Sequence, residues 1–159
     1  MLDGTTVVAA IPAAGFTHLV WLPDSHLGMW ETALAASSFP VIRPCREGEA
    51  VGIAAGLMLG GTRPLVVMQC TGFFEAGDAV RNVVHDLKLP LKLIVGVRSW
   101  RAALAGKSAD NCPHFAERLV GAWELPCGWF DPSTDAAGFP DVLGRLATQP
   151  GPGVILWAE

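Results

Sequence analysis

Two carboxylates, Glu47 and Glu49, open a segment that is otherwise made almost wholly of small and apolar residues, "CREGEAVGIAAGLMLGG" from Cys45 to Gly61. A carboxyl at the head of a buried helix can serve as a general acid or base, because burial raises its pKa. Acids also favour a helix N-terminus for structural reasons alone, since the partial positive charge there stabilises them by about 0.3–1 kcal/mol each. The local residues do not separate these two interpretations.

The helix that follows these acids is unusually poor in side chains. Gly52, Ala54, Ala55 and Gly56 leave much of its surface bare, although each helical glycine costs about 1 kcal/mol relative to alanine. Small residues are tolerated where another backbone or a flat ligand must approach closely. The pattern therefore favours an interface, with an acid at its edge.

The chain around this helix alternates between strands and helices over a single domain, residues 1–159. Continuous apolar runs predict buried parallel strands, and the stretches between them predict helices. We expect an α/β fold, a three-layer α/β/α sandwich with a mainly parallel sheet. The expected strands are 17–23, 39–44, 64–69, 91–97 and 151–159. The expected helices are 4–14, 25–37, 47–59, 75–89 and one from about 140 to 149. The irregular stretch 98–112 follows a strand, where ligands bind in such folds.

Composition narrows the function classes. Apolar residues make up 51% of the chain and charged residues 16%, below the usual ~25%, which favours burial against a partner subunit. The net charge of −4 without a basic block argues against nucleic-acid binding. No apolar run approaches the ~18 residues of a membrane span, and the N-terminus lacks the basic region of a secretion signal. The four cysteines form no CxxC pair. We therefore expect reduced thiols, a cytoplasmic location, and no zinc site in this chain.

The stretch "REGEAVGIAAGLMLGGTRPLVVMQCTGF" resembles the pyrimidine-binding domain of thiamine diphosphate-dependent decarboxylases, above all the sulfopyruvate and phosphonopyruvate decarboxylases. Further similar pieces are "WLPDS" (21–25), "KLPLKLIVGVRS" (88–99) and "DNCPHF" (110–115). The resemblance covers most of residues 1–125, in order. It implies the thiamine-diphosphate-binding fold of the pyrimidine type and decarboxylation of a 2-oxo acid.

The resemblance also distinguishes the two acids. In these enzymes the catalytic Glu stands nine residues before a Gly of the same helix, and counting back from Gly56 gives Glu47. Glu47 is then the residue that hydrogen-bonds the cofactor's aminopyrimidine, and Glu49 has no assigned role. The other implied cofactor contacts are Gln69, Thr71, Gly72 and Phe73.

The family's diphosphate-binding half, with its GDG…N motif and metal ion, is not found in this sequence. The resemblance therefore implies a separate β subunit that holds the diphosphate and Mg²⁺, in an α2β2 or larger assembly. This chain itself is expected to provide no metal ligand.

Substrate-binding residues are expected in three places. Asp24 and Ser25 follow the first strand, although Ser25 could simply cap a helix and Asp24 make a turn. Cys70 stands where related sequences commonly have Asn, which leaves the substrate open, and we do not expect it to be a nucleophile. Arg98 and His114 flank the irregular stretch and, with Arg101 and Lys107, would suit a sulfonate or phosphonate tail. As a solvated face, these four residues need no function.

Three alternatives stay open at this point. The first is a carboligase subunit with the same cofactor, and the second is a non-catalytic pyrimidine-domain protein that assembles with or regulates another enzyme. The third, a flavodoxin-like nucleotide binder, is weakened because "PDSHLG" follows the first strand where a phosphate-binding glycine loop would stand.

Overall fold

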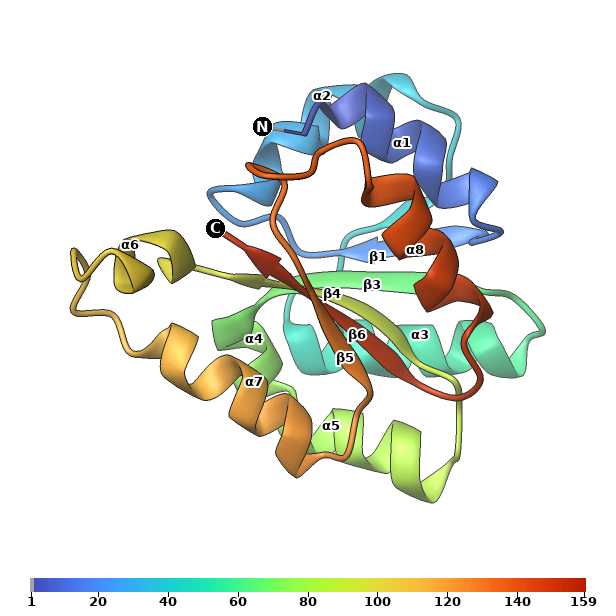
Figure 1. The fold of residues 1–159 in the computed structure, drawn as a ribbon. Coiled ribbons are helices and arrows are strands. Elements are labelled where there is room, and N and C mark those ends of the chain that lie inside the picture. The colour runs from blue at the N-terminus through green and yellow to red at the C-terminus, as the bar shows by residue number, and fades with distance from the viewer. Residues whose placement is uncertain (1) are drawn as a thin grey trace.

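One sheet of six parallel strands forms the centre of the molecule (Figure 1). The structure is a computed structural model that describes residues 2–159. The strand order across the sheet is β2-β1-β3-β4-β6-β5. The strands are β1 (His18–Trp21), β2 (Val41–Ile42), β3 (Pro64–Gln69), β4 (Lys92–Val97), β5 (Cys127–Phe130) and β6 (Gly153–Ala158). The expected α/β fold class is confirmed, and the sheet is entirely parallel.

Helices connect the strands and cover both faces of the sheet. Before β3 lie α1 (Gly4–Ala13), the 3₁₀ turn η1 (Leu27–Trp30), α2 (Glu31–Ala36) and α3 (Glu47–Leu59). Between β3 and β4 lie α4 (Cys70–Glu75), α5 (Gly77–Arg81) and the π-helical turn η2 (Asn82–Asp86). After β4 come α6 (Trp100–Leu104), α7 (Cys112–Ala122) and α8 (Phe139–Thr148).

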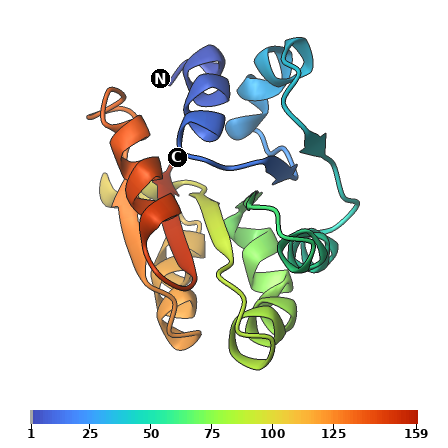
Figure 2. The same ribbon diagram turned by 90° about the vertical axis from the view of Figure 1, so that its right-hand side faces the viewer.

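The sheet separates these helices into two groups, one on each face (Figure 2), and an apolar layer lies between the sheet and each group. Alternate strand residues point to opposite faces, so Val66 and Met68 pack with α3, α4, α5 and α7. Leu65 and Val67 face the other way and pack with α1, α2 and α8. Because both faces are covered, all six residues of β4 are buried. This explains the continuous apolar runs in the sequence.

The expected elements agree with the structure over most of the chain, with three corrections. The expected helix at 75–89 begins earlier, at Cys70 directly after β3, breaks at Ala76 and ends in a π-helical turn. Strand β5 and helices α6 and α7 were not expected. Strand β5 escapes a search for apolar runs because it is an edge strand whose Cys127 and Gly128 are exposed.

The third correction concerns the start of η1. Ser25 was considered as the cap of the following helix, but it is exposed, and the residue before η1 is His26. The capping side chain is Asp24, whose Oδ1 accepts hydrogen bonds from the backbone N–H groups of His26 and Leu27, both at 2.7 Å. Within residues 2–159, no helix is both long and apolar enough to cross a bilayer.

Candidate active site

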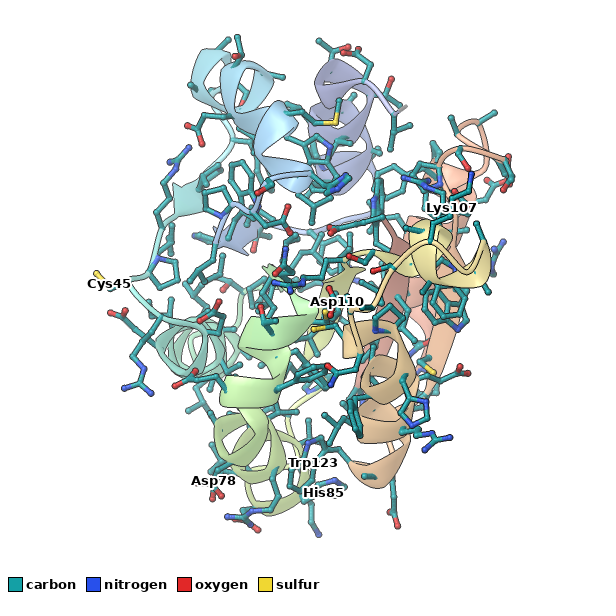
Figure 3. All side chains as sticks on the ribbon, turned by 90° about the vertical axis from the view of Figure 1, so that its left-hand side faces the viewer. Cys45, Asp78, His85, Lys107, Asp110 and Trp123 are labelled. Atoms are coloured by element: carbon teal, nitrogen blue, oxygen red, sulfur yellow. The ribbon has the colours of Figure 1, made fainter. Side chains whose placement is uncertain are left out.

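The candidate site lies along the edge at which the parallel strands end, which we call the carboxyl edge. Trp21, Gln69, Val97 and Ala158 are the last residues of β1, β3, β4 and β6, and parallel pairing places these ends side by side. Figure 3 looks onto this edge. Most residues singled out from the sequence therefore lie on the same side of the molecule.

Glu47 is the first residue of α3, and its side chain is half-buried. It packs against Gly72 of α4 so closely that a Cβ at position 72 would overlap the Glu47 carboxyl group. Gly72 is itself buried. The glycine therefore leaves a space that the Glu47 carboxyl fills, and two segments distant in the sequence hold this acid in place.

The head of α3 is stabilised by other acids, which leaves Glu47 free of that role. Glu75, at the end of α4, forms an ion pair with Arg46 and accepts a hydrogen bond from the backbone N–H of Gly48 at 3.2 Å. The hydrogen bond from Arg46 lowers the pKa of Glu75. Glu49 is exposed, and its carboxylate accepts the backbone N–H of Cys45 at 2.7 Å. Glu49 and Glu75 therefore satisfy donors near the helix start, which is a structural task.

The predicted cofactor contacts at the end of β3 differ in accessibility. Gln69 is half-buried and Thr71 exposed, and the Thr71 hydroxyl donates to Gln69 Oε1 at 2.9 Å. Phe73 is fully buried in the core. Cys70 is also fully buried, and this burial raises its thiol pKa to about 12. A thiol with so high a pKa stays protonated at physiological pH, whereas the deprotonated thiolate is the nucleophilic form of cysteine.

A carboxylate that sequence reasoning missed completes this part of the edge. Glu159 follows β6 directly, is only 4% exposed, and lies beside Asp24 above Gly96 of β4. Burial and then the neighbouring Asp24 carboxylate raise the pKa of Glu159 to about 8. An acid directly after the apolar run "GVILWA" was the available signal.

The basic residues expected to bind an anionic tail each have a different environment in the structure. Arg98 Nε pairs with Asp110 Oδ2 at 2.7 Å, and Arg101 Nη1 pairs with Asp131 Oδ1 at 2.9 Å. Lys107 lies well away from Asp110 (Figure 3).

His114 is exposed on α7, where its ring contacts Phe115 edge-on at 5.0 Å. Arg98 and Arg101 thus neutralise acids of this chain, and a substrate tail would have to compete for them. A substrate role for Arg98 and His114 stays a prediction.

The Arg98–Asp110 pair orders the stretch after β4. Asp110 Oδ1 also accepts the N–H of Cys112 at the start of α7, at 3.0 Å. The Cys112 N–H, and then the Arg98 guanidinium, hold the pKa of Asp110 well below its usual range. Next to Arg98, Ser99 has a left-handed backbone with φ +61°, a conformation that is rare for residues other than glycine. The loop at the carboxyl edge is therefore held in a defined, strained form.

Among residues 2–159, no group of three His, Cys, Asp or Glu side chains is placed to hold a metal ion. Outside the edge, His85 Nε2 contacts the carbonyl oxygen of Trp123 at 2.8 Å, which joins η2 to the end of α7 (Figure 3). That contact is structural.

Known proteins resemble this chain in sequence. It is 35% identical over 92 residues to a sulfopyruvate decarboxylase of Methanosarcina acetivorans, covering 56% of this chain and 23% of the relative. It is 30% identical over 91 residues to the sulfopyruvate decarboxylase subunit alpha of Methanococcus maripaludis, covering 56% of this chain and 52% of the relative. A phosphonopyruvate decarboxylase of Streptomyces viridochromogenes is 24% identical over 122 residues, 76% of this chain and 30% of the relative. No protein-family model matches the chain.

Solved structures share the fold over almost the whole chain. Benzoylformate decarboxylase from Polynucleobacter necessarius superposes with a TM-score of 0.74 at 19% identity, over 99% of this chain and 30% of that one. The thiamine diphosphate-dependent 4-hydroxybenzoylformate decarboxylase of Rhodococcus jostii gives 0.69 at 19% identity, with the same coverage.

The resemblance to thiamine diphosphate-dependent decarboxylases is confirmed. The fold is the expected pyrimidine-type fold of these enzymes. The chain spans about a quarter and about half of the first two relatives that it matches.

Proposed function

We propose that this chain is the pyrimidine-binding α subunit of a heteromeric thiamine diphosphate-dependent 2-oxo acid decarboxylase. The proposed substrate resembles sulfopyruvate or phosphonopyruvate, and the products are an aldehyde and carbon dioxide. The observation that carries the proposal is the half-buried Glu47 carboxyl, which is held at the head of α3 against a glycine that admits no side chain. The sulfopyruvate and phosphonopyruvate decarboxylases that the chain resembles support the substrate class.

The residues present fit the pyrimidine end of the cofactor. Glu47 is partly accessible, and among residues 2–159 no hydrogen bond or ion pair occupies its carboxyl group. Neighbouring Gln69 and Thr71 offer an amide and a hydroxyl at the same edge. We assign Glu47, Gln69, Thr71 and Gly72 to the cofactor's aminopyrimidine. Phe73 would support them from the core.

Each of these residues has a separate proposed role in the reaction. When bound, thiamine diphosphate supplies an electron sink for the electron pair that is released as carbon dioxide leaves. Glu47 would contact the pyrimidine nitrogen with a carboxyl oxygen, a group that can both take up and give back a proton, which glutamine cannot do. Asp24, fixed by two backbone N–H groups, is proposed to face the reacting end of the substrate. Arg98 and His114 are proposed to approach its anionic tail.

A partner subunit is required to complete this site. The α3 face that carries Gly52 and Gly56 is exposed, with open space where their side chains would be. Leu59 extends this face and is 71% exposed. Such a face allows a second backbone to approach closely. We propose that a β subunit packs here and holds the diphosphate and Mg²⁺, in an α2β2 or larger assembly, and we expect the complex in the cytoplasm.

Co-expression with a candidate β subunit tests the proposal. Carbon dioxide release is measured over a panel of 2-oxo acids for the wild type, Glu47→Gln and the matched control Glu49→Gln. We expect an active pair, an inactive isolated chain, and loss of about 10²–10⁴-fold in turnover for Glu47→Gln. Glu49→Gln keeps an oxygen for the Cys45 N–H and should retain full turnover.

Three results would count against this assignment. Full activity in Glu47→Gln would refute the role of Glu47. An assembled complex that releases no carbon dioxide would favour a non-catalytic assembly protein. Coupling of two 2-oxo acids in place of aldehyde release would indicate a carboligase.

A further inference from the structure

The carboxyl group of Asp24, which follows β1, and that of Glu159, which follows β6, meet at the carboxyl edge. A Cβ built on Gly96 would touch Glu159 Oε1 and would lie 3.2 Å from Asp24 Oδ2. Glycine at position 96 therefore provides the space that both acids share. A Cβ built on Gly72 would meet Glu47 instead, so the two contacts involve different glycines and different acids.

The pair is buried without donors. Glu159 Oε1, Glu159 Oε2 and Asp24 Oδ2 are all buried and have no hydrogen-bond partner among the described residues. Asp24 Oδ1, by contrast, accepts two backbone N–H groups. An ionised carboxylate in such surroundings without a donor would be very unfavourable. The simplest way to satisfy these oxygens is a proton on one acid, donated to the other.

Charged groups around the pair do not replace that proton. Arg98 and Arg101 both favour the ionised form of Glu159, but each already pairs with an aspartate, Asp110 or Asp131. The Cys70 thiol, also near Glu159, is neutral at physiological pH. Both arginines therefore form ion pairs with other acids, and Asp24 is the dominant charged neighbour of Glu159.

We propose that Asp24 and Glu159 share one proton, with Glu159 as a positioning residue that holds Asp24 in place and stores the proton for the proposed active site. The proton resides on Glu159, because neither of its buried carboxyl oxygens has a donor, whereas Asp24 Oδ1 already accepts two backbone N–H groups. The pair therefore carries one negative charge and one transferable proton at neutral pH. Burial and the Asp24 carboxylate, which raise the pKa of Glu159 to about 8, support this distribution.

The role of the stored proton rests on the proposed function. When a 2-oxo acid loses carbon dioxide, the electrons of the broken carbon–carbon bond stay on the former keto carbon. That carbon must take up one proton to become the aldehyde C–H. The pair can release its proton through Asp24 and regain one from water, so the exchange balances over a turnover.

Carboxyl titration of the chain alone tests the shared proton. The ¹³C side-chain carboxyl signals of labelled protein are followed by NMR from about pH 3 to about pH 10, a range that covers the protonated and the ionised state of each carboxyl group. The proteins compared are the wild type, Asp24→Asn, Glu159→Gln and the exposed control Glu117→Gln. One wild-type carboxyl should titrate near pH 8. That signal should be lost in Glu159→Gln, move down by at least about one pH unit in Asp24→Asn, and stay in Glu117→Gln.

The wild type alone can overturn the proposal, even if a variant fails to fold. If every Asp and Glu carboxyl of the wild type titrates below about pH 6, there is no shared proton. In the co-expressed complex, Glu159→Gln should lower kcat about a hundredfold and remove the alkaline limb near pH 8, with little change in KM. An unchanged kcat and pH profile would overturn the storage role. A titration near pH 8 in a chain whose complex has no decarboxylase activity would leave the proton pair standing and refute the proposed function.

Discussion

Replacing Glu159 by glutamine should change how the stability of the protein depends on pH. Glutamine keeps the shape of the side chain and donates an N–H to Asp24, but it cannot ionise. In the wild type, the pKa of Glu159 is about 8 in the folded state, against about 4.3 in the unfolded chain. Between these values the folded protein binds one proton more than the unfolded chain. The stabilisation is therefore fully present below about pH 4.3 and is lost as the pH rises toward 8.

The size of the effect follows from the linkage between proton binding and folding. Each pH unit in that window costs the wild type about 1.4 kcal/mol of unfolding free energy. From pH 5 to pH 8 the loss approaches about 4 kcal/mol, which is a large part of the roughly 5–15 kcal/mol that stabilises a typical domain. Because Glu159→Gln lacks this titration, its stability relative to the wild type should rise by that amount over the same range. Groups such as Asp110 titrate equally in both proteins, so their contributions cancel in the difference.

Urea unfolding at pH 5, 6, 7 and 8 measures this difference directly. The exposed variant Glu117→Gln serves as the control and should follow the wild type at every pH. A difference between Glu159→Gln and the wild type that stays constant across the four pH values would refute the reasoning, because it would mean that Glu159 ionises as easily in the folded state as in the unfolded one.

Three further substitutions test the packing of the site. Gly72→Ala should displace the Glu47 carboxyl, because the new Cβ would overlap it. We expect the turnover of the co-expressed complex to fall at least about tenfold, since small misplacements of a reacting group have large effects. Urea unfolding should show a loss of less than about 3 kcal/mol in the free energy of unfolding. Gly96→Ala should destabilise the chain by about 1–3 kcal/mol, because its Cβ would enter the space of a buried carboxyl; an unchanged unfolding midpoint would contradict the close contact. Asp110→Ala should lower the free energy of unfolding by about 1–2 kcal/mol above about pH 4, through loss of the α7 cap and of the ion pair with Arg98. Because the pKa of Asp110 is lowered in the folded state, this difference from the wild type should shrink as the pH falls below about 4. A difference that persists at about pH 2 would contradict this prediction.

Local sequence pattern was sufficient for most elements of the fold. The bounds of β3 and α3 agree with the expected 64–69 and 47–59, because continuous apolar runs and a small-residue helix leave few alternatives. Pattern failed where pairing or packing decides the structure. Strand β5 is held by its pairing with β6 along one side, and α4 begins at Cys70 because Cys70 and Phe73 are buried in the core beneath the sheet edge. Neither condition is local to the residues concerned.

The site divides in the same way. The sequence pattern predicted that Glu47 lies at the head of a helix rich in small residues and that Asp24 follows the first strand, and the family resemblance selected Glu47 over Glu49. Only the tertiary structure decided that Gly72 makes room for Glu47, that Arg98 and Arg101 are already paired, and that Glu159 lies beside Asp24. The physical reason is that a residue's type and neighbours in sequence determine what it can do chemically. The partners that set its protonation state come from strands far apart in the chain, and their placement follows from the order of strands in the sheet.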